Sequence, residues 1–63
     1  MTFDDAVALV SQWPADRSVP RKLKAGIATA NGFDRVAMLQ LVEALMVASE
    51  TEADFRLIGT YFD

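Results

Sequence analysis

The sequence predicts a compact all-α bundle of three to four short helices. Apolar residues make up 52% of the chain, which is enough for a packed core, and they recur at the three- and four-residue spacing of helices. Capping residues and turn formers separate these periodic segments. With 63 residues the chain forms one small domain, residues 1–63. A core this small stabilises a fold by roughly 3–5 kcal/mol, which favours support from a partner or a second copy.

The first helix is expected over about residues 3–13. Thr2 can cap the free amides of the first turn, and Asp5, three residues later, nearly completes a capping box. Pro14 ends the helix, because the residue before a proline is pushed out of the α region. The apolar residues share one sector of about 120°, as expected for a one-sided surface helix. They are Phe3, Ala6, Val7, Val10 and Trp13.

The second helix is expected over about residues 20–30. Ser18 supplies a polar cap and Pro20 a proline in the first turn. Gly32 is expected to close the helix at a positive φ, with Phe33 making the hydrophobic contact that accompanies such a cap. The apolar stripe consists of Leu23, Ile27 and Ala30.

The third helix, about residues 35–48 with Asp34 as its cap, is the most apolar part of the chain. Its core sector holds Met38, Leu41, Val42 and Leu45, and a strip facing water holds Val36, Gln40, Glu43 and Val47. Leu39 and Met46 lie outside the core sector. A helix that is apolar over so much of its circumference is either central to the bundle or shared with another molecule.

The fourth helix is expected over about residues 52–62, because Thr51 and Asp54 have the spacing of a second capping box. Its inner face is expected to hold Phe55, Ile58 and Phe62. The competing interpretation makes residues 55–62 a strand, since aromatic and β-branched residues favour strands. The helix is preferred because a single strand has nothing to pair with in one copy.

The composition excludes most catalytic and metal chemistry. The chain has no Cys and no His, which excludes disulfides, thiol catalysis and histidine-based sites. Asp4 and Asp5 are adjacent, so on a helix they point about 100° apart and act only at the positive end of the helix. Glu50, Glu52 and Asp54 lack the further ligands and the turn glycine of a calcium loop. We therefore expect no enzyme activity, no metal and no nucleotide or other cofactor.

The charge distribution and the surplus apolar residues point to a protein partner. Lys and Arg number 6 against 9 Asp and Glu, which disfavours nucleic acid. Four basic residues lie within eight positions and could grip an acidic partner or a phosphate, or form only a solvated helix face: Arg17, Arg21, Lys22 and Lys24. Four large residues fall outside the core sectors and are expected at a partner surface: Leu39, Met46, Leu57 and Tyr61.

One segment, residues 23–43, resembles a helix-turn-helix DNA-binding unit. The spacing matches the alanine, turn glycine and core aliphatic positions of that unit at Ile27-Ala28, Gly32-Phe33, Met38 and Leu41. The resemblance implies a recognition helix that starts near Asp34 and a DNA-binding regulator as the alternative function.

The favoured function is a small acidic protein–protein interaction module. It would be a stoichiometric inhibitor or regulator of a larger protein, of the size and composition of phage-encoded inhibitors, or an adaptor. The partner is another protein or a second copy in a homodimer. No apolar run approaches the ~20 residues that span a bilayer, and two Asp stand near the first residue, so a cytoplasmic protein without membrane contact is expected.

Overall fold

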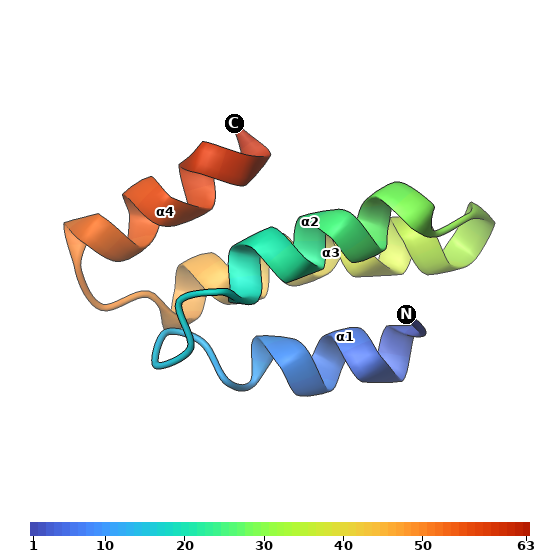
Figure 1. Ribbon diagram of the computed structural model, residues 1–63, viewed down its shortest axis with the longest axis horizontal. Helices are drawn as coiled ribbons and strands as arrows, with labels where there is room; N and C mark the ends of the chain where they lie inside the picture. The colour runs from blue at the N-terminus through green and yellow to red at the C-terminus, as the bar shows by residue number, and fades with distance from the viewer.

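The computed structural model describes residues 1–63 and contains four helices and no strand (Figure 1). These are α1 (Phe3–Val10), α2 (Val19–Thr29), α3 (Gly32–Ala48) and α4 (Glu52–Phe62). The predicted all-α bundle is confirmed, and the strand interpretation of residues 55–62 is wrong because this segment is helical. None of the four helices combines the length and the apolar character that crossing a membrane requires.

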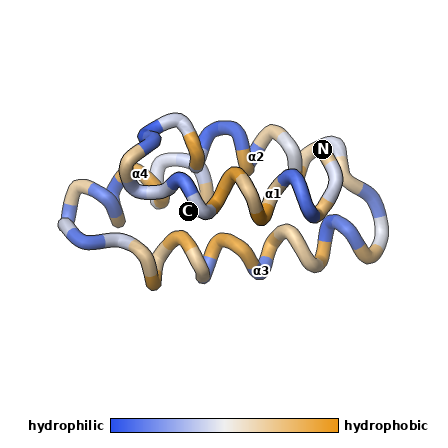
Figure 2. The backbone as a smooth tube through the Cα atoms, turned by 90° about the horizontal axis from the view of Figure 1, so that it is seen from below, coloured by the Kyte–Doolittle hydropathy of each residue, from blue (hydrophilic) through white to orange (hydrophobic).

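The helices form two layers. α2 and α3 run antiparallel and overlap in Figure 1, with α1 and α4 on opposite sides of α2. Seen from below, α3 lies apart from the other three helices (Figure 2). α2 and α3 each contact all the other helices, whereas α1 and α4 do not contact each other. Three short helices therefore cover one side of α3 and leave the other side bare.

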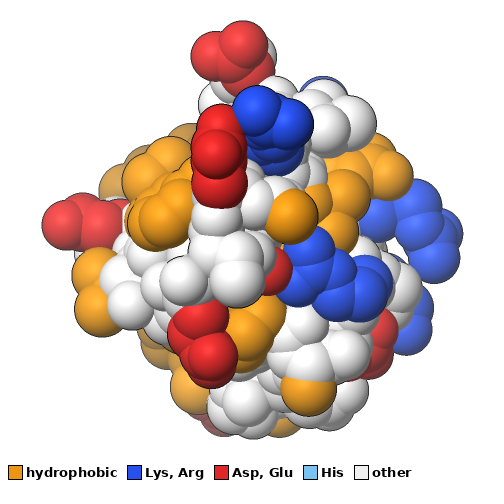
Figure 3. Space-filling view, turned by 90° about the vertical axis from the view of Figure 1, so that its left-hand side faces the viewer, with side chains coloured by type: hydrophobic (Ala, Val, Ile, Leu, Met, Phe, Trp, Pro, Cys, Tyr) orange, Lys and Arg blue, Asp and Glu red, His pale blue; other side chains and the backbone are white.

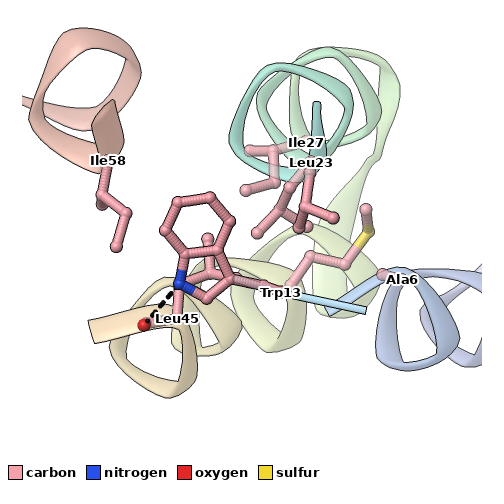
Figure 4. Packing of buried hydrophobic residues seen from close by; sticks show 8 residues of the cluster. Ala6, Trp13, Leu23, Ile27, Leu45 and Ile58 are labelled. Carbon is pink, nitrogen blue, oxygen red and sulfur yellow. Dashed lines mark hydrogen bonds between the residues drawn. The ribbon is translucent and has the colours of Figure 1, made fainter. Parts of the chain in front are cut away.

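The core lies between the two layers and draws residues from all four helices. Its eight buried apolar residues are Ala6, Trp13, Val19, Leu23, Ile27, Met38, Leu45 and Ile58. The Trp13 ring stands between Ile58 of α4 and the α2 side chains, above Leu45 of α3 (Figure 4). Full burial of each large aliphatic side chain stabilises the fold by about 1.5–3 kcal/mol. The predicted inward positions on α2 and α3 are confirmed.

Two predicted core residues, Val7 and Phe55, are instead exposed. On α4 the inward side chains are Asp54 and Ile58, four residues apart on one face. Phe55 follows Asp54 directly, so its side chain points about 100° away from that face. Burial of a carboxylate at residue 54 thus turns Phe55 outward.

Two helix boundaries differ from the prediction. α1 ends at Val10 and not at residue 13, because the chain tightens there into three-residue hydrogen bonds, one of them from Trp13 N–H to the Val10 carbonyl. α3 begins at Gly32 and not at residue 35, so Asp34 lies in its first turn and is not its cap.

Gly32 adopts the predicted positive φ, 56°. It does so as the first residue of α3, two residues beyond the Ala30 cap of α2, and its surroundings are open. The expected contact of Phe33 is wrong, because this side chain points into solvent. Only Gly adopts this conformation without steric cost, so Gly32 allows the chain to reverse within two residues and α3 to return along α2.

Replacing Gly32 with Ala should lower the free energy of unfolding by about 1–2 kcal/mol, the cost of a left-handed L-residue. Gly59 is the matched control, because it lies in α4 with open space around it and no positive φ. Gly59→Ala should raise the free energy of unfolding by up to about 1 kcal/mol. Urea unfolding followed by the fluorescence of Trp13, the one tryptophan, measures both. Equal effects at the two positions would contradict the assigned backbone geometry.

Candidate functional site

The exposed side of α3 carries five large apolar side chains. Their exposed fractions are 84% for Phe33, 56% for Val36, 47% for Leu39, 45% for Met46 and 81% for Val47. Successive helical residues are rotated by about 100°, which places Phe33, Val36 and Val47 opposite Met38 and Leu45, with Leu39 and Met46 together on one flank of that sector. We call this sector, with Gln40 and Glu43 at its centre, the α3 outer face. The other three helices lie on one side of α3 (Figure 2), and the exposed side chains lie on the side that they leave uncovered.

The α3 outer face exists because α3 is apolar on more than one side. Of its 17 residues only Met38 and Leu45 are fully buried. Leu39 and Met46 are exposed, as their position outside the core sector predicts. Val36 and Val47 are expected in a strip facing water, which is where they lie, and not at a partner surface. Their neighbours on that strip are the polar Gln40 and Glu43, which is why the strip is predicted to face water.

The C-terminal half of the α3 outer face has a shallow hollow and one charge. This hollow is wide open to solvent and is lined by Gln40, Glu43, Ala44, Val47 and Ala48. Ala44 contributes no more than a methyl group, so the longer side chains beside it form the rim. Glu43 is the one charged residue of the α3 outer face. Covering this face would bury apolar groups and would leave the Glu43 carboxylate in need of a hydrogen-bond donor.

The four basic candidates do not act as one group. Arg21, Lys22 and Lys24 are exposed on α2, and no ion pair involves them. Arg17 is held in place: its guanidinium lies 4.7 Å from the centroid of the Trp13 ring and donates to Asp54. Arg17 therefore stabilises the fold, unlike the three basic residues of α2. On the end of the molecule that Figure 3 shows, basic and acidic side chains alternate with apolar ones.

The two candidates on α4 are less accessible than those on α3. Leu57 and Tyr61 are both half-buried, and Leu57 packs against the core cluster. Leu39 and Met46 keep nearly half of their surface exposed. The accessible apolar surface predicted from sequence is thus concentrated on α3.

Asp54 is the one buried charged group, with 6% of its side chain exposed. Its Oδ2 accepts hydrogen bonds from the backbone N–H of Glu50 at 2.8 Å and of Thr51 at 3.1 Å, and its Oδ1 accepts one from Arg17. Hydrogen bonds lower the pKa of Asp54 from its ordinary value of 3.8 to about 2. The bond from the Glu50 N–H has the largest effect and the bond from Arg17 the next largest. The capping box predicted at Thr51 and Asp54 is confirmed. The pairing with Arg17 was missed, because no local pattern indicates it.

Trp13, whose ring lies against the Arg17 guanidinium, is hydrogen-bonded to the end of α3. Its Nε1–H donates to the Leu45 carbonyl at 3.1 Å (Figure 4) and to Ser49 Oγ at 3.2 Å. The Leu45 carbonyl belongs to the last turn of α3, where helical partners are missing. Together with the ion pair of Arg17, these bonds tie the segment between α1 and α2 to the end of α3 and the first turn of α4. These contacts hold the neighbouring segments against the buried side of α3.

The α3 outer face is the most distinctive surface feature of residues 1–63. No group of three or more acidic side chains is arranged to hold a metal ion. Every buried side-chain nitrogen and oxygen has a hydrogen-bond partner. Comparison with protein-family models, with curated proteins and with solved structures finds no match for the chain.

The low pKa of Asp54 predicts an acid-sensitive fold. A carboxylate with a lowered folded-state pKa stabilises the fold above its unfolded-state pKa, and this contribution is lost as the pH falls from about 4 to about 2. Asp54→Asn should therefore reduce stability at pH 7 and flatten the decline between pH 4 and pH 2. Urea unfolding at several pH values, followed by Trp13 fluorescence, measures this.

Asp5 provides the matched control for this measurement. It occupies the equivalent position in the capping box of α1, but it is exposed and has no arginine partner. Asp5→Asn should cost less stability at pH 7 and leave most of the acid-dependent decline in place. An Asp54→Asn variant that keeps the pH dependence of the original chain would contradict the role given to the buried carboxylate.

Proposed function

We propose that this protein is a small acidic protein–protein interaction module that docks through the α3 outer face. The observation that supports it is the row of five exposed apolar side chains on one side of α3. Several large apolar side chains exposed together on one side of a small fold usually mark an interaction site. The backbone beneath it is an unbroken helix of 17 residues, so the surface is rigid and loses little entropy on binding.

The mode of action follows from what the surface offers. α3 is about 25 Å long at 1.5 Å per residue, the length of a helix or strand that could lie along it. Gln40 and Glu43 would fix the register of such a partner through hydrogen bonds, while Phe33 and Val47 supply apolar anchors at the two ends. A module of this kind regulates, inhibits or bridges a larger protein by occupying its surface, one copy per target.

The geometry of α2 and α3 favours a protein partner over DNA. In a helix-turn-helix unit the two helices cross at roughly 90–120°, whereas α2 and α3 lie antiparallel (Figure 1). The exposed side of α3 also presents Glu43, whose charge repels phosphate, and apolar groups that read no base edge except a methyl. Arg35 stands at the N-terminal end of α3, outside the α3 outer face. Salt-dependent binding to duplex DNA remains the test of the DNA-binding alternative.

Photo-crosslinking from α3 tests the proposal. A photoreactive amino acid at Val47 should give a specific crosslink to a partner protein in cell extract, because this side chain is 81% exposed within the α3 outer face. The same group at Ala28, exposed on α2, is the matched control and should give none. The partner identified by mass spectrometry is then purified, and its affinity for the chain is measured directly.

Binding by the purified partner provides the second half of the test. Val47→Lys should weaken binding at least ~10-fold, the effect of losing about 1.4 kcal/mol of contact energy. Lys24→Gln, on the outer side of α2, should leave the affinity unchanged. If the α2 variant loses binding and the α3 variant keeps it, the docking surface lies on the basic residues and the proposal is wrong.

A further inference from the structure

We infer that the α3 outer face pairs with a second copy of this chain, in an antiparallel arrangement whose two-fold axis passes between Leu41 and Val42. The inference rests on the proposed docking surface and names one occupant for it. It follows from the order of side chains along α3, from the placement of the one charge and from the area available.

The seam of the α3 outer face has the spacing of a coiled coil. Phe33, Val36, Gln40, Glu43 and Val47 follow one another at alternating intervals of three and four residues. The last four have intervals of four, three and four, which read the same in both directions. A two-fold dimer requires such a self-complementary surface. In the antiparallel pair Val36 meets Val47 of the second copy at both ends.

The two flanks of the seam are also self-complementary. Leu39 and Met46, seven residues apart, lie on one flank, and antiparallel pairing brings Leu39 beside Met46 of the second copy. Ala37 and Ala44 lie on the other flank, where their small side chains allow the helices to approach closely. The exposed apolar groups of one copy thus find apolar groups of the other.

The polar centre of the seam favours the antiparallel orientation. In the antiparallel pair Gln40 lies level with Glu43 of the second copy, so its amide can donate to that carboxylate, and the two-fold axis repeats the bond. A parallel pair would place Glu43 level with Glu43, whereas the antiparallel pair offsets the two carboxylates by three residues, about 4.5 Å along the axis, which reduces their repulsion without removing it. Gln40, Glu43, Ala44 and Val47, which line the shallow hollow, have the spacing of a hole in knobs-into-holes packing. Gln40 of the second copy enters it.

The available area sets the strength of the pair. Half of the surface of a helix about 25 Å long amounts to roughly 500 Å², so two copies bury at most about 1,000 Å², the lower limit for a specific interface. We therefore expect a reversible dimer that dissociates at micromolar concentration, with the face free for another partner at lower concentration.

Single cysteines test the arrangement sharply, because the chain has none of its own. Val36→Cys and Val47→Cys variants, mixed under mild oxidation, should form a disulfide between the two variants. Neither variant alone should form one, because in the antiparallel pair equal positions lie 11 residues apart, about 16 Å along the helix, and a disulfide requires Cα atoms within about 7 Å. Disulfides in each variant alone, at the yield of the mixture, would overturn the antiparallel pairing.

Sedimentation of the unmodified chain over a concentration series tests the pairing without cysteines. The chain should pass from monomer to dimer between about 1 and 500 µM, the range expected for an interface of this size. Val47→Glu should weaken the dimer at least ~10-fold, and Ala28→Glu, on exposed α2, should not. A monomer at every concentration, with no disulfide in the mixture, would overturn self-pairing. The proposed function is judged separately, by the crosslink from Val47 to a different protein.

Discussion

The length of the chain limits how much of α3 can be covered. α3 spans 17 residues and is apolar around most of its circumference, while α1, α2 and α4 have only 8, 11 and 11 residues. These three helices lie on one side of α3, and the core between them and α3 holds eight buried apolar residues, including Trp13 from the segment after α1. Any further apolar burial by α3 must come from another molecule, and the proposals for function and for self-pairing both follow from this limit.

Two polar contacts hold the segment after α1 and the start of α4 together on the covered side of α3. α1 and α4 do not contact each other, so the segment that follows α1 must be joined to α4 in another way. The buried carboxylate of Asp54 does this through Arg17, and Trp13 extends the connection to the last turn of α3. These groups satisfy one another at the end of the bundle, where α3 ends and α4 begins.

The sequence predicts the features that depend on neighbouring residues. Both capping boxes are local patterns, and the positive φ of Gly32 follows from its place between two periodic segments. The exposure of Phe55 and the burial of Asp54 depend on Arg17, 37 residues away, and no periodicity of α4 indicates it. The α3 outer face was only partly predicted, because the helical wheel identified Leu39 and Met46 but treated Val36 and Val47 as solvated positions.

The most direct test compares the same substitution on the two sides of α3. Leu45→Asn and Leu39→Asn change helix propensity equally, but Leu45 is fully buried and Leu39 is nearly half exposed. In dilute solution Leu45→Asn should lower the free energy of unfolding by about 3 kcal/mol or more, and Leu39→Asn by about 1 kcal/mol or less. Trp13 fluorescence during urea unfolding measures both. Equal losses would show that the outer side of α3 belongs to the core of the monomer, which contradicts a docking surface there.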